Sequence, residues 1–163
     1  MSDEKWKTAE ELMTELNKNP EFLRRRAAKD KRRKEREEEF AQLERPVVER
    51  MRAIGFEAIS ITDAIKKYSP LPDKLVELLL DSIRQSSVVK LLEWLIRALA
   101  AARRPFNGQA LIECYDKFND IELRWVILNT IACAKPHSID NWIQNASRDP
   151  YVAETLEKLG YKK

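Results

Sequence analysis

The pattern of hydrophobic and polar positions over residues 73–160 predicts three successive helical hairpins. Each pairs an amphipathic helix with a second, more apolar helix across a short polar turn. The expected hairpins span residues 72–103, 107–134 and 138–160. Units of this kind cannot bury their apolar faces alone, so they stack on one another. The pattern therefore predicts an all-α chain containing a short α-solenoid of antiparallel helix pairs.

The second helices carry few polar residues, and in the first hairpin these fall on one narrow face. Lys90, Glu93 and Arg97 interrupt an otherwise apolar run, and Arg124 occupies a similar place in the second hairpin. A helix with so thin a polar stripe is covered on most sides. We therefore expect these four side chains to project from the inner helix surface and to contact a partner.

The chain before residue 46 predicts a separate, highly charged helical extension. Thr8 and Glu11 have the spacing of a capping box, and an apolar stripe follows to residue 16. Asn19 and Pro20 then suit the start of a longer helix. Apolar spacing resumes at residues 40–54, where we expect Pro46 to kink or restart the helix. The expected domains are an arm at 1–45 and a solenoid at 46–163.

The extension contains a block of basic residues. Residues 24–36 hold nine basic and two acidic side chains, and residues 37–44 hold four acidic and no basic ones. A solvated helical spacer is one interpretation. The alternative is a nucleic-acid-binding arm, since clustered Lys and Arg neutralise phosphates. The candidate nucleic-acid contacts are Arg24, Arg25, Arg26, Lys31, Arg32, Arg33 and Lys34.

Composition supports helices and a cytoplasmic location. The 163 residues are 44% hydrophobic and 35% charged, with 3 glycines and a net charge of +3. The N-terminal sequence Met-Ser-Asp-Glu-Lys-Trp-Lys is largely polar and has no apolar h-region, which predicts no secretory signal. No apolar run reaches the ~18 residues of a membrane helix. We therefore expect no membrane association. We also expect Cys114 and Cys133 to be buried, reduced thiols.

The inventory of reactive side chains is poor. His137 is the one histidine, and it follows Pro136 at a helix junction, where capping of carbonyls is the expected role. Neither a zinc-ligand spacing nor a glycine-rich phosphate loop is present. We therefore expect no catalytic residue, no metal site and no cofactor.

The helix pairs resemble HEAT or armadillo-type repeats over about half of the chain. The resemblance is carried by residues 149–152 with Leu156, Leu159 and Gly160, and by the starts Val89-Lys90 and Leu123-Arg124. It implies an α-solenoid with a scaffold or binding role. Some HEAT-like proteins excise alkylated bases from DNA with aromatic and basic residues. The residues relevant to that activity are Trp94, Trp125, Trp142, Lys90, Arg97, Arg103, Arg104 and Arg124, although we expect Trp94 and Trp125 to lie in the core.

The leading functional hypothesis is a non-enzymatic protein-interaction module, or adaptor. Its partner would be a protein bound by the second helices. Weak nucleic-acid binding through residues 24–36 and, less strongly supported, a glycosylase are the alternatives. Self-association through residues 8–18 and the stripe at 40–54 is a further hypothesis.

Overall fold

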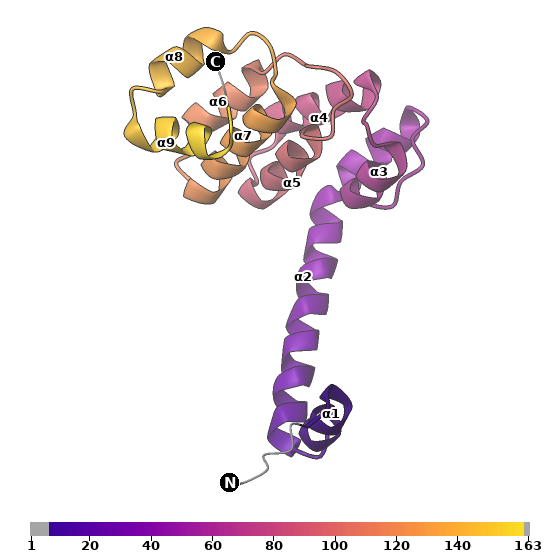
Figure 1. Cartoon of the computed structure of the whole chain (residues 1–163). Helices are drawn as coiled ribbons and strands as arrows, with labels where there is room; N and C mark the ends of the chain where they lie inside the picture. Colours follow the sequence, from indigo (N-terminus) through magenta and orange to yellow (C-terminus); the bar gives the residue numbers. More distant parts are fainter. Residues whose placement is uncertain (1–6, 162–163) are drawn as a thin grey trace. The chain divides into compact units, whose positions relative to one another are not determined.

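The structure is a computed structural model that describes residues 7–161, and it confirms the all-α class (Figure 1). The prediction of no secretory signal rests largely on residues 1–6, which lie outside the described residues. Residues 7–161 form nine helices and no strand longer than an isolated bridge. None of these helices combines the length and apolarity that a membrane span requires. The helices are α1 Ala9–Leu16, α2 Pro20–Ala53, α3 Ile61–Tyr68, α4 Asp73–Gln85, α5 Val89–Leu99, α6 Gln109–Lys117, α7 Ile121–Ala134, α8 Asp140–Ala146 and α9 Pro150–Lys158.

The chain divides into two compact units, Met1–Gln42 and Leu43–Lys163. Helix α2 contributes to both and is continuous across Pro46, so the expected restart at this proline is wrong. The missing amide of Pro46 would have bonded the carbonyl of Gln42. Both residues are exposed, so water can solvate that carbonyl. The functional division into an arm at 1–45 and a solenoid at 46–163 stays a prediction.

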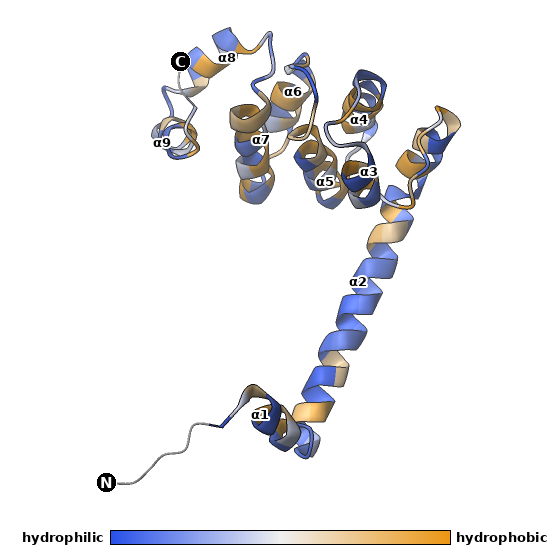
Figure 2. Cartoon of the chain, turned by 45° about the vertical axis from the view of Figure 1, so that its right-hand side comes forward, coloured by the Kyte–Doolittle hydropathy of each residue, from blue (hydrophilic) through white to orange (hydrophobic). Residues whose placement is uncertain are grey.

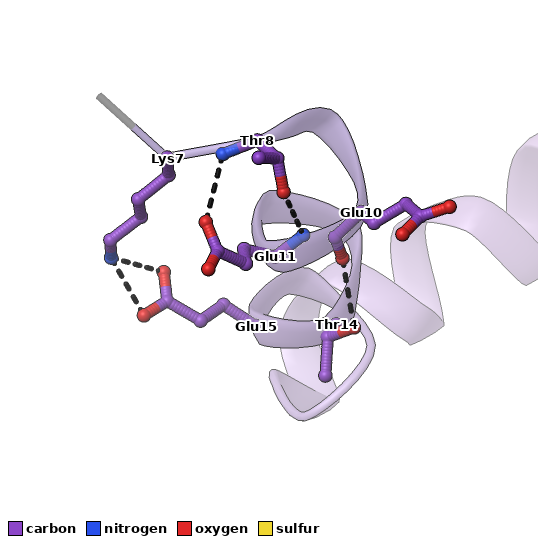
Figure 3. A network of polar contacts seen from close by, with 6 residues as sticks. All are labelled: Lys7, Thr8, Glu10, Glu11, Thr14 and Glu15. Carbon is purple, nitrogen blue, oxygen red and sulfur yellow. Dashed lines mark hydrogen bonds and ion pairs between the residues drawn. The ribbon is translucent and has the colours of Figure 1, made fainter. Parts of the chain in front are cut away.

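In the first unit, α1 begins with the predicted capping box (Figure 3). The Thr8 hydroxyl accepts a hydrogen bond from the Glu11 amide at 3.2 Å, and the Glu11 carboxylate accepts one from the Thr8 amide at 2.9 Å. Lys7 pairs with Glu15 at 2.6 Å. These local contacts specify the helix, which buries none of its own side chains.

Helix α2 begins as the sequence predicts, with Asn19 as its cap. The Asn19 carboxamide oxygen accepts hydrogen bonds from the amides of Glu21 and Phe22. Figure 2 shows a long hydrophilic stretch in this helix. Residues 23–39 are all exposed, so this stretch is held by local backbone and charge interactions rather than by packing.

The second unit contains the apolar core. Each predicted hairpin contains two helices, namely α4 and α5, α6 and α7, and α8 and α9. Contacts run from α3 to α5, from α5 to α7 and from α7 to α9, and α4 also contacts α6. Leu92, Leu95, Ile96 and Leu99 of α5 are fully buried, as are Leu123 and Ile127 of α7. Whether this packing constitutes a solenoid of antiparallel pairs stays a prediction.

The end of α2 belongs to this core. Val47 and Met51 are buried in it. These two residues of the apolar stripe at 40–54 are therefore not exposed for self-association. The helix ends at Ala53, and Gly55, two residues later, has a φ of 94°, which suits a left-handed cap. The Phe56 amide bonds back to the Met51 carbonyl at 3.0 Å, which completes the cap.

Candidate interaction face on α5, α7 and α9

Three helices of the second unit, α5, α7 and α9, expose aromatic and apolar side chains on one surface. A depression of about 470 Å³ is lined by residues of α5, α7 and α9. Trp94 of α5 is also exposed and lies one helical turn before Arg97. We call this surface the aromatic face. Its residues are Trp94, Arg97, Ile121, Glu122, Trp125 and Tyr151.

The exposure of the two tryptophans corrects the sequence prediction that they lie in the core. Trp94 is 38% exposed and Trp125 is 43% exposed. Both sit inside apolar runs, but each also lies on the narrow polar stripe of its helix. Trp125 is three residues after Glu122 and four before Asn129, and Trp94 is four after Lys90. Residues at this spacing share a helix face, but only the packing of the helices decides whether that face is covered.

Ile121 and Tyr151 complete the exposed apolar area. Ile121 is the first residue of α7 and is 70% exposed. Tyr151 follows Pro150 in the first turn of α9 and is 39% exposed. Isolated surface hydrophobics are ordinary, whereas several that line one depression mark a candidate binding surface.

Carboxylates gather beside the aromatic face. Partial burial raises the pKa of Glu93, and the nearby carboxylates of Glu122 and Asp120 raise it further, while Arg97 opposes these effects. Two further carboxylates and one guanidinium therefore lie near Glu93 where α5 meets α7. The excess of negative charge favours a cationic group on an incoming ligand.

The structure brings three of the four predicted partner-binding residues to this region. Lys90, Glu93 and Arg97 lie on α5, the first two half-buried and Arg97 exposed. Arg97 lines the depression itself.

Arg124 does not line the depression. Its guanidinium lies 4.8 Å from the centre of the Tyr115 ring, and its Nε donates a hydrogen bond to the Phe118 carbonyl at 3.1 Å. This side chain therefore stabilises the packing of α7 against α6. A substitution at Arg124 would therefore weaken the packing of α7 against α6 as well as change any binding surface.

The remaining reactive side chains are dispersed. His137 is exposed, and its ring contacts the Ser138 hydroxyl at 2.9 Å, not a helix carbonyl. Burial raises the pKa of the Cys114 thiol to about 11. Cys133 is exposed, so the expectation of two buried thiols holds for Cys114 alone. In residues 7–161 no three His, Cys, Asp or Glu side chains are grouped to hold a metal ion.

The basic block occupies an exposed part of α2 in the first unit. All seven predicted nucleic-acid contacts are exposed. Three of them form ion pairs with acidic residues one turn later, namely Lys31 with Glu35, Arg33 with Glu37 and Lys34 with Glu38. Arg25 also forms an ion pair, with Glu21, an acidic residue one turn earlier in the helix.

Comparison with known protein families, curated proteins and solved structures finds no match to this chain. The class that fold and site define is an all-α protein with an exposed aromatic face on adjacent helices. Proposals about its role rest on the chemistry of its surfaces.

Proposed function

We propose that this protein is a non-enzymatic interaction module, an adaptor whose aromatic face binds a protein partner. In this proposal the second unit is a short, HEAT-like α-solenoid of antiparallel helix pairs. The observation that carries it is the depression lined by Ile121, Trp125 and Tyr151. Tryptophan and tyrosine are enriched among the residues that dominate binding energy at protein interfaces.

The charges around the depression indicate the chemistry of the partner. An apolar side chain would enter between Trp125 and Tyr151, where it loses contact with water. A neighbouring Lys or Arg of the partner would approach Glu93 and Glu122, whose mutual repulsion it would relieve. A helical or extended segment that combines aliphatic and basic residues meets both demands.

The test is co-purification of the tagged, full-length protein from the cells that naturally make it, after nuclease treatment. Two variants are compared. The first is a double variant of the aromatic face that combines Ile121→Ser and Trp125→Ala, and the second is the single variant Ile59→Ser, which serves as the control. Ile59 is a suitable control because it is 77% exposed, close to the exposure of Ile121.

We expect one stoichiometric protein partner whose recovery falls at least about tenfold for the aromatic-face variant and is unchanged for Ile59→Ser. The partner's bound segment should contain aliphatic and basic residues. Equal recovery with both variants, or an acidic bound segment, would exclude the aromatic face as this binding site. Thermal unfolding of each variant confirms that it remains folded.

A further inference from the structure

Six basic residues of α2 lie on one side of the helix. Each residue of an α-helix advances by about 100° around the axis, and on this basis six basic side chains fall within about 120°. No acidic residue between positions 21 and 39 falls in that range. We call this surface the basic sector. It comprises Arg25, Arg26, Lys29, Arg32, Arg33 and Arg36.

The ion pairs of this helix lie outside the basic sector or at its margins. Lys31 and Lys34, which pair with Glu35 and Glu38, are on the other side of α2. Lys29, Arg32 and Arg36 lie within about 60° of one another in the sector. Within residues 7–161, none of these three forms an ion pair with a carboxylate.

The segregation of charge argues against a purely structural role for the whole block. A solvated helix that is stabilised by its own charges intersperses the two signs on its surface, so that each cation meets an anion one turn away. The side with Lys31 and Lys34 has this arrangement. In the basic sector, Arg25 and Arg33 pair with Glu21 and Glu37, which lie just outside it. The other four cations form no ion pair among residues 7–161, and their mutual repulsion is relieved when an anionic ligand binds.

We propose that the basic sector binds the phosphodiester backbone of a nucleic acid. From Arg25 to Arg36 it extends for about 16 Å along the helix axis. A DNA duplex carries one negative charge per about 1.7 Å of its axis, so an array of anions faces this length of helix. Arg guanidinium groups, five of the six cations, form bidentate hydrogen bonds with phosphate oxygens.

The composition of the helix favours nucleic acid over an anionic membrane. A helix that lies in a membrane interface needs a broad apolar face. Residues 29–39 contain no apolar side chain, and the basic sector contains no aromatic one. Without aromatic rings for base stacking, recognition is limited to the backbone and does not depend on base sequence. This interaction is separate from the aromatic face, which belongs to the other unit.

The test measures binding of the full-length protein to fluorescein-labelled duplexes of about 20 base pairs, one of DNA and one of RNA, between about 50 and about 200 mM salt. A triple variant replaces Lys29, Arg32 and Arg36 with Gln. The matched control replaces Arg24, Lys31 and Lys34 with Gln, which removes the same charge from the other side. Circular dichroism checks the helix content, which Gln should preserve.

With six phosphate contacts, the plot of log affinity against log salt should have a slope of about −5. The basic-sector variant should reduce the size of this slope to about −3 and should bind every sequence more weakly. The control triple variant should change the slope little. A preference for DNA or RNA identifies the natural duplex. Equal loss with both triples, no binding to either duplex at low salt, or binding only to phosphatidylserine vesicles would overturn the proposal. The basic-sector variant should also co-purify normally with the protein partner, which separates the two proposals.

Discussion

At the residue scale, Glu44 shows how burial and hydrogen bonding oppose each other at one carboxylate. It is the only charged side chain that is buried among residues 7–161. Its oxygen accepts a hydrogen bond from the Ile61 amide at 2.8 Å, at the first turn of α3. Burial raises the pKa of Glu44, and the hydrogen bond from Ile61 partly offsets that rise. The carboxylate therefore links α2 to the start of α3 at an electrostatic cost.

We predict that Glu44→Gln removes this cost and keeps the hydrogen-bond acceptor. A carboxyl group whose pKa is raised by folding contributes stability below its unfolded pKa, and that contribution is lost as pH rises through the folded pKa. The free energy of unfolding of the variant, relative to the original protein, should therefore increase between about pH 4 and about pH 7. Urea unfolding at three pH values measures this difference.

Glu44→Ala is the control, because it also removes the acceptor. It should be about 1–3 kcal/mol less stable than Glu44→Gln at every pH, since the Ile61 amide loses its partner. A Glu44→Gln difference that stays constant or decreases with rising pH would contradict the assignment of burial as the dominant influence.

At the element scale, helix boundaries followed from local chemistry that is visible in the sequence. Asn19, Asp120 and Asp149 each accept an amide hydrogen bond at the start of a helix. Such contacts involve residues two or three positions apart, so tertiary structure is not needed to predict them. Pro46 was different, because its effect depends on whether the exposed Gln42 carbonyl can be solvated.

The end of α2 gives the prediction at this scale. Gly55→Ala should destabilise the protein by about 1 kcal/mol, because an L-residue with a Cβ resists the left-handed conformation. No atom lies within 4 Å of the position of that added Cβ, so the cost is conformational and not steric. Gly55→Asn should cost less, since Asn tolerates positive φ. Urea midpoints compare the two variants, and a larger loss for Asn would contradict the argument.

At the scale of the whole molecule, the two units differ in what holds them together. The second unit has a core that extends from Val47 to Leu156. The first has no buried residue among those described, and it depends on caps, ion pairs and the hydrogen bonds of its helices. Segments without buried apolar contacts open locally at low free-energy cost.

Limited digestion with trypsin should therefore begin between Arg24 and Arg36, before cleavage at exposed Arg103 or Lys66. Mass spectrometry of the early products identifies the first site. The remaining fragment should unfold with the same thermal midpoint as the intact protein, because its core is unchanged. First cleavage at Arg103 would show that the long helix is more resistant than its lack of packing suggests.

The sequence alone determined the elements whose causes are local. Apolar periodicity predicted the helices between residues 73 and 160, and capping residues predicted where α1 and α2 begin. It also placed Lys90, Glu93 and Arg97 on one face of α5. The physical reason is that helix geometry and caps depend on residues only a few positions apart.

Only the tertiary structure decided which apolar residues are covered and which remain exposed. Trp125 looked like a core residue because its neighbours in sequence are apolar, but the packing of α7 buries Val126 and Ile127 and leaves Trp125 exposed. The packing also placed Arg124 beside the Tyr115 ring, a contact that the sequence did not predict, while its role in binding stays a prediction. Burial depends on which helices contact α7, and those contacts join residues far apart in the chain.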